Sequence, residues 1–114
     1  MSNMQNPDCI RIRHIIDACY SIERFIKDRS IKDLDDNEML SFALVRAIEI
    51  IGEAASKVTQ ETRNQIPDLP WGEIIGMRNR LIHAYFDINH SILWATVQRD
   101  IPELKKLLES FDCK

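Results

Sequence analysis

The sequence predicts an all-α protein: one domain over residues 1–114, built as an antiparallel bundle of four main helices. Apolar residues recur at spacings of three and four along most of the chain, which is the period of an amphipathic helix. No period-two alternation of Val, Ile and Thr reaches the length of a strand. The 114 residues are 45% apolar and 29% charged, which is the composition of one small globular domain.

The first two helices have recognisable starts. The first is predicted to begin after Asn6, a typical cap, with Pro7 and Asp8 in its first turn. A polar stretch then breaks the pattern, and the second helix is predicted to begin near Asp35, which has capping-box spacing to Glu38. Their apolar stripes are Cys9, Ile12, Ile15, Ile16, Cys19, Ile22 and Ile26, and Leu40, Ala43, Ala47, Ile50, Ile51, Ala54 and Val58.

Proline positions mark the other two helices. Pro70 suits the first turn of the third helix, and a short connection with a cap candidate at Asn89 leads to the last one. Pro102 lies inside the last stripe, so a kink is predicted there rather than an end. The two helices hold Trp71, Ile74, Ile75, Arg78, Leu81 and Ile82, and Leu93, Val97, Ile101, Leu104, Leu108 and Phe111.

Composition excludes several classes of function. The formal net charge is −3, so the chain lacks the basic excess of a protein that binds nucleic acid by bulk charge. It shows no transmembrane stretch and no secretory signal, so a cytoplasmic protein without membrane contact is expected. The cysteines of the first stripe, Cys9 and Cys19, are predicted to be reduced core residues. No Gly-rich phosphate loop or zinc-type ligand spacing occurs, so neither a cofactor nor a metal is expected.

The polar residues that could take part in catalysis cluster between Arg78 and Asp87. On a continuous helix, Arg78 and His83 would lie about 140° and 7.5 Å apart, whereas Asn79 and His83 would share a face. Imidazole acts as acid or base near neutral pH, and guanidinium stabilises extra phosphate charge, so the pair fits metal-free RNA cleavage. One chain offers one such histidine, and a two-fold homodimer would supply two. The spacing alone also fits a solvated, salt-bridged helix end.

The string Arg78-x4-His83-x-Tyr85 resembles the signature of the HepT-like branch of the HEPN ribonucleases. These are toxins paired with MntA-type minimal nucleotidyltransferases. Surrounding segments extend the resemblance over about residues 8 to 110: Glu49-Ile-Ile-Gly-Glu53-Ala, Pro70-Trp71, Gly76-Met-Arg-Asn-Arg-Leu-Ile-His83, Tyr85-Phe-Asp87, Trp94 and Asp100-Ile-Pro102-x-Leu104.

The resemblance implies a HEPN-like helical homodimer, a metal-independent endoribonuclease that acts as the toxin of a type VII-like toxin–antitoxin pair. Arg78 and His83 match the catalytic pair, Asn79 matches its polar companion, and Arg80 is a supporting cation. Tyr85 matches the tyrosine to which the antitoxin attaches AMP. The implied partners are RNA, an MntA-like nucleotidyltransferase and a second copy of the chain. The rival interpretation is a non-catalytic helical subunit that presents a substrate to a separate nucleotidyltransferase.

Two glutamates near the middle of the chain allow two interpretations. Glu49 and Glu53 share one face of the second predicted helix, on either side of Gly52. They could orient Arg78 or Arg80 through their carboxylates. Alternatively, the segment packs closely against another helix at Gly52, and the two glutamates form ion pairs at the border of that contact. This second interpretation is preferred.

Overall fold

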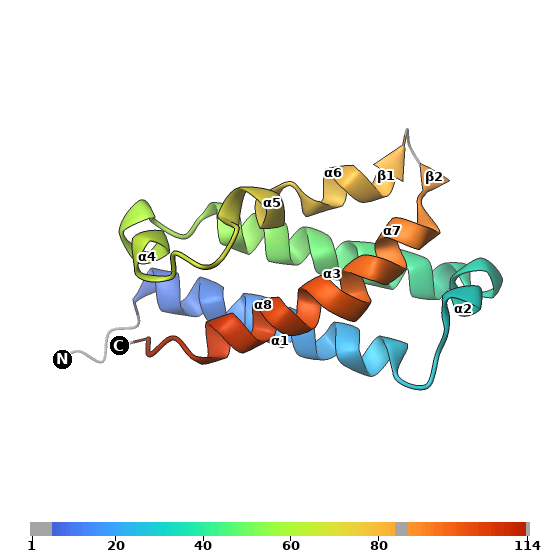
Figure 1. Cartoon of the computed structure of the whole chain (residues 1–114), viewed down its shortest axis with the longest axis horizontal. Coiled ribbons are helices and arrows are strands. Elements are labelled where there is room, and N and C mark those ends of the chain that lie inside the picture. Colours follow the sequence, from blue (N-terminus) through green and yellow to red (C-terminus); the bar gives the residue numbers. More distant parts are fainter. Residues whose placement is uncertain (1–5, 84–86, 114) are drawn as a thin grey trace.

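Two long antiparallel helices, α1 (Pro7–Ile26) and α3 (Glu38–Ser56), run along the molecule in the computed structural model, which describes residues 6–83 and 87–113 (Figure 1). The helix α2 (Ile31–Asp36) joins them at one end. The chain continues through α4 (Gln60–Gln65), α5 (Trp71–Ile75), α6 (Met77–Leu81), the strands β1 (Ile82–His83) and β2 (Asp87–Ile88), α7 (His90–Ala95), the π-helical turn η1 (Thr96–Asp100) and α8 (Ile101–Glu109).

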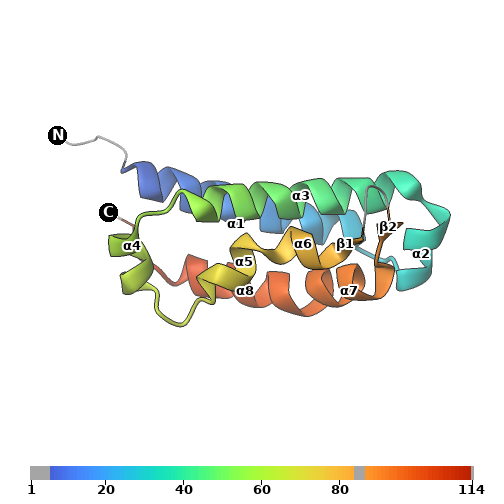
Figure 2. The same ribbon diagram turned by 90° about the horizontal axis from the view of Figure 1, so that it is seen from above.

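These elements form the predicted all-α bundle. Figure 2 shows α1 and α3 in one layer, and α5–α6 beside α7–α8 in the other. The apolar stripes of all four helical segments meet in one core between the layers. Its fully buried side chains include Ile15, Ile22, Leu44, Ile48, Leu81, Leu93, Ile101 and Leu108.

The start of α3 corrects the predicted capping box. Asp35 belongs to the preceding helix α2, and the cap of α3 is Asn37, whose side chain accepts a hydrogen bond from the Leu40 N–H at 3.1 Å. Glu38 is the first residue of α3 itself. Asn37 therefore fills the capping role that the spacing had suggested for Asp35.

The third predicted helix is not continuous. It breaks at Gly76, with φ −90° and ψ 5°, into α5 and α6, and it ends at Leu81. Ile82 is extended, with φ −117° and ψ 120°, and pairs with Ile88 in an antiparallel hairpin. Glycine weakens a helix, and β-branched Ile82 suits a strand. The helical geometry expected between Arg78 and His83 therefore does not apply.

A kink is predicted at Pro102, and the structure has a π-helical turn, η1, directly before the helix that holds this proline. The N–H of Ile101 bonds to the carbonyl of Thr96, five residues back, and α8 begins directly afterwards with Pro102 in its first turn. Proline has no N–H to donate, so it is tolerated in the first turn of a helix. A single turn of π-helix is a known way to accommodate such a break.

The cysteines correct one expectation and confirm another. Cys9 is joined by a disulfide to Cys113, 104 residues later, and is therefore not a reduced core residue. The bundle topology explains the pairing, because the end of the chain returns to the end of the bundle where α1 begins (Figure 1). Cys19 is free and buried as predicted, and burial, together with nearby Glu23, raises the pKa of its thiol to about 12.

Asp8 joins α1 to α4, beyond the first-turn role expected for it. The predicted cap is confirmed, because Asn6 Oδ1 accepts the Asp8 N–H at 2.8 Å. The Asp8 carboxylate is buried and accepts hydrogen bonds from the Thr59 N–H at 3.1 Å, the Thr59 hydroxyl at 2.6 Å and the Thr62 hydroxyl at 2.5 Å. Burial alone would raise the pKa of Asp8, but these hydrogen bonds outweigh it and the pKa is lowered.

Candidate active site between α3 and α6

A hollow of about 370 Å³ lies where α5 and α6 pack against α3. The packing is close because residue 52 is glycine: a Cβ there would lie 3.1 Å from the carbonyl oxygen of Ile75, tighter than an ordinary contact. The close approach that Gly52 was expected to permit is therefore present. The hollow is lined by Ile48, Glu49, Gly52, Glu53, Ser56, Ile75, Arg78 and Asn79.

Arg78 of α6 reaches across the hollow to α3. Its Nε donates a hydrogen bond to Glu49 Oε2 at 2.6 Å, and its Nη1 lies 3.5 Å from Asn79 Oδ1. The Arg78 side chain keeps 47% of its surface exposed. The carboxylate of Glu49 thus holds Arg78 through Nε, and Asn79 is a second, longer contact at Nη1, while nearly half of the side chain remains exposed to solvent.

A second arginine, Arg46, shares the same carboxylate. Its Nη1 lies 3.4 Å from Glu49 Oε1 and 3.7 Å from Glu53 Oε1. The four side chains form a row of alternating charge from Arg78 through Glu49 and Arg46 to Glu53. Sequence reasoning had not selected Arg46, although it lies three residues before Glu49 and seven before Glu53, on the same helix face.

The row leaves an anion site of a familiar chemical type. A guanidinium presents five N–H donors in a planar fork, and the hydrogen bond to Glu49 uses the Nε–H of Arg78. The long contact of Nη1 with Asn79 takes at most one more N–H, and two of the remaining Nη–H groups can donate to two phosphate oxygens. The arrangement can therefore receive a phosphodiester at the outer end of Arg78.

The other predicted site residues are described less fully. The backbone of His83 ends β1 and is paired with Asp87 across the hairpin, two residues beyond the end of α6. The structure does not describe the side chain of His83, and Tyr85 lies outside the described residues. The catalytic and AMP-acceptor roles expected for them therefore stay predictions.

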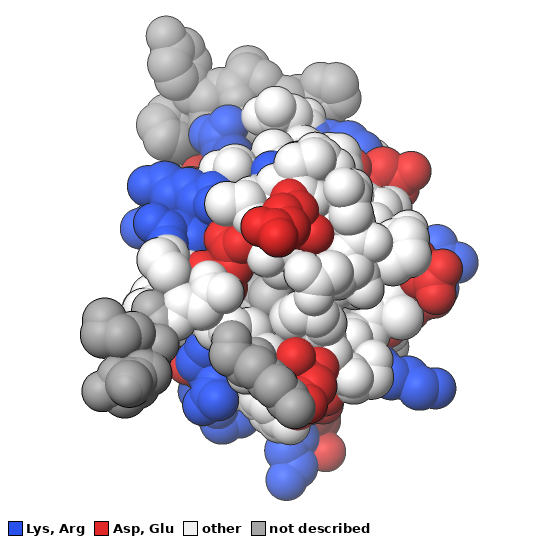
Figure 3. Space-filling model, turned by 90° about the vertical axis from the view of Figure 1, so that its left-hand side faces the viewer, with Lys and Arg blue, Asp and Glu red and all other residues white. Residues whose placement is uncertain are grey.

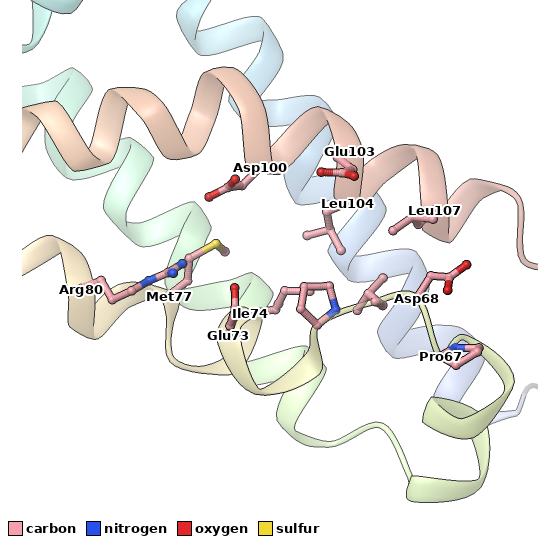
Figure 4. A pocket seen from close by; sticks show the side chains of 12 residues that line it. Pro67, Asp68, Glu73, Ile74, Met77, Arg80, Asp100, Glu103, Leu104 and Leu107 are labelled. Atoms are coloured by element: carbon pink, nitrogen blue, oxygen red, sulfur yellow. The ribbon is translucent and has the colours of Figure 1, made fainter.

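Arg80 is placed away from Arg78. It lines a different hollow, of about 430 Å³, between α5–α6 and the helix formed by η1 and α8 (Figure 4). Successive helical residues turn by about 100°, so residues two apart point to nearly opposite sides. Carboxylates of the same hollow would weaken phosphate binding at Arg80, and the supporting role expected for this residue stays a prediction. These acidic residues are Asp68, Glu73, Asp100 and Glu103.

The charge distribution, metal-ligating residue types and helix lengths of the described residues complete the description. Basic and acidic side chains are interspersed with uncharged surface at the end of the bundle that carries α4 (Figure 3). Within residues 6–83 and 87–113, no group of three His, Cys, Asp or Glu side chains is placed to hold a metal ion. The helices described there are too short or too polar to cross a membrane.

The family model and the similar proteins found for this chain all carry the description ribonuclease or RNase. A family model described as "Ribonuclease HepT-like" matches residues 15–111. The chain is 39% identical over 95 residues to "Putative RNase MJ1380" of Methanocaldococcus jannaschii, a match that covers 83% of this chain and 87% of that protein. It is 39% identical over 98 residues to "Probable ribonuclease HepT" of Thermococcus cleftensis, with 86% and 89% covered. No solved structure gives a significant match.

Proposed function

This chain belongs to the HepT-like ribonuclease family, and we propose that it is an endoribonuclease that cleaves RNA without a metal ion. The observation that carries the proposal is the position of the Arg78 guanidinium beside Glu49. The guanidinium is held at Nε by Glu49, the Arg78 side chain is about half exposed, and it lies five residues before His83 in the chain. The residue proposed to bind the phosphate is therefore close in sequence to His83, whose imidazole can transfer protons.

The proposed reaction is internal transesterification. A base takes the proton from the ribose 2′-OH, the 2′-oxygen forms a bond to the adjacent phosphorus, and the bond from phosphorus to the 5′-oxygen breaks. An acid donates a proton to that leaving oxygen. The products are a 2′,3′-cyclic phosphate and a 5′-hydroxyl. Arg78 stabilises the extra negative charge that develops on the phosphoryl oxygens.

The acid and the base are proposed to be His83 residues from two copies of the chain. A single imidazole cannot hold the proton needed by the leaving group while it accepts one from the nucleophile. A two-fold dimer brings two copies of the same side chain together at one interface. Light scattering at micromolar concentration should therefore give the mass of a dimer, and a monomer would contradict this arrangement.

Cleavage of a labelled RNA by the purified chain tests the proposal. Activity should survive EDTA and leave cyclic phosphate ends. His83→Ala should abolish it, and Arg78→Ala should raise the barrier by about 3 kcal/mol or more, while both variants keep the helical circular dichroism of the parent. Unchanged cleavage by His83→Ala would refute the mechanism. A parent protein that binds a nucleotidyltransferase but never cleaves RNA would favour the non-catalytic subunit instead.

The protein is proposed to be the toxin of a toxin–antitoxin pair. Its regulation is proposed to act through Tyr85. AMP attached to the Tyr85 hydroxyl would add a purine and a negatively charged phosphodiester two residues from His83. That charge would compete with RNA for Arg78. Coexpression with a minimal nucleotidyltransferase should add AMP to Tyr85, detected by peptide mass spectrometry. A Tyr85→Phe protein that is silenced as fully as the parent would show that control runs through binding instead.

A further inference from the structure

We infer that Glu49 is a positioning residue for RNA cleavage: it holds the Arg78 guanidinium so that its outer edge faces the scissile phosphate. The inference rests on the proposed function. It is carried by the 2.6 Å hydrogen bond from Arg78 Nε to Glu49 Oε2, which joins the short helix α6 to the long helix α3. Glu49 is not itself in the path of the reacting atoms.

The short helix α6 needs such support. It has five residues, follows the break at Gly76 and ends where the chain becomes extended at Ile82. Met77 and Leu81 anchor α6 in the core, but Arg78 lies on its exposed side, and a long arginine side chain has many rotamers unless a partner holds it. The partner lies on α3, which has 19 residues and is anchored in the core along its length, so a carboxylate on it is a stable reference point. The close contact of Gly52, three residues after Glu49, with the carbonyl of Ile75 holds the end of α5 against α3, two residues before α6 begins.

Glu49 and Glu53 differ in ways that separate positioning from general charge. The Glu49 side chain is 27% exposed and contacts both Arg78 and Arg46. The Glu53 side chain is 68% exposed and its ion pair is with Arg46, at 3.7 Å. Both are carboxylates that line one hollow, so each should repel an incoming phosphate. Glu53 is therefore a matched control for Glu49.

A carboxylate beside a phosphate site lowers affinity, so the benefit of Glu49 should appear in the chemical step. Removing its charge should tighten RNA binding and, at the same time, slow cleavage, because a neutral amide oxygen is a weaker acceptor than a carboxylate and holds Arg78 less firmly. A lowered KM together with a lowered kcat is not expected from a residue that only stabilises the fold. Misplacing a catalytic group by about 1 Å can cost about 100-fold in rate.

The experiment compares Glu49→Gln, Glu49→Asp and Glu53→Gln with the parent in kcat and KM on a labelled RNA. We expect Glu49→Gln to lower kcat at least about tenfold and to lower KM. Glu49→Asp keeps the charge but shortens the reach by one methylene, so it should lower kcat without lowering KM. Glu53→Gln should lower KM but change kcat less than about twofold. Thermal melts establish that each variant is folded.

A double-variant test asks whether Glu49 acts through Arg78. Arg78→Lys keeps a positive charge but lacks the Nε of the guanidinium fork. Adding Glu49→Gln to Arg78→Lys should have little further effect on kcat, because the contact is already lost. An equal loss of kcat in both backgrounds, or equal kcat for Glu49→Gln and Glu53→Gln, would overturn the positioning role and leave the proposed function standing. A parent that does not cleave RNA would overturn both.

Discussion

Replacing Asp8 by alanine should be among the most destabilising single changes outside the hydrophobic core. Asp8 is 6% exposed, and its carboxylate accepts three hydrogen bonds from Thr59 and Thr62, which begin the helix α4 more than fifty residues later. A hydrogen bond to a charged group contributes about 1.5–3 kcal/mol. The two threonine hydroxyls can turn toward other acceptors in the variant, whereas the Thr59 N–H loses its partner.

From this geometry we expect Asp8→Ala to lower the free energy of unfolding by about 3 kcal/mol. This is a large part of the roughly 5–15 kcal/mol that stabilises a small domain, and it corresponds to a fall of about 10 °C in Tm for a chain of this size. Urea unfolding followed by circular dichroism measures the effect. Asp17→Ala, an exposed aspartate on the same helix α1, is the matched control and should cost less than about 0.5 kcal/mol.

The pH dependence of stability tests the cause of that loss. The folded-state pKa of Asp8 is lowered from the usual 3.8, so its ionised form stabilises the fold at pH values above the unfolded pKa. That contribution is lost as the pH falls through the lowered folded pKa. The stability difference between the parent and Asp8→Asn should therefore be full at pH 7 and shrink as the pH falls below about 4. A difference that stays constant from pH 7 to pH 2 would refute the reasoning.

Two further predictions follow from the packing and the thiols. Gly52→Ala adds a Cβ 3.1 Å from the Ile75 carbonyl, so overpacking of about 1–3 kcal/mol should exceed the gain of about 1 kcal/mol in helix propensity. Its Tm should fall, and an unchanged or higher Tm would show that α5 yields easily. Without reductant, the folded chain should resist alkylation, and the unfolded chain should expose one thiol, Cys19; three reactive thiols would exclude the Cys9–Cys113 disulfide.

The helical fold was predictable because local signals and core packing agree. Asn6 and Asn89 cap α1 and α7 as expected, and the apolar stripes of all four segments are buried or half-buried. The short helices α2 and α4 were missed because six residues are too few to show an amphipathic period. The disulfide was missed because the proximity of Cys9 and Cys113 depends on how helices far apart in the sequence align.

For the candidate site, the sequence motif predicts residue types, and the structure adds a geometry that the motif does not contain. The motif includes Arg78. It does not show that the helix breaks at Gly76 and ends at Leu81, after which the backbone is extended. A sequence pattern treats Arg78 and Arg80 as neighbours in one basic cluster. The structure sends them to different hollows, because a helix turns about 200° over two residues.

The two interpretations of the Glu49 and Glu53 segment turn out to be compatible. Gly52 admits the Ile75 carbonyl, and this close packing brings α6 near enough for Arg78 to reach Glu49. Residues three apart on a helix face the same neighbour, so a helix that packs closely at Gly52 also presents Glu49 to the element it packs against. Because the same contact sets both the spacing and the reach of the arginine, widening it in Gly52→Ala should weaken the Arg78–Glu49 hydrogen bond along with the fold. A Gly52→Ala protein that loses stability but keeps the full kcat on RNA would separate the two effects and contradict this coupling.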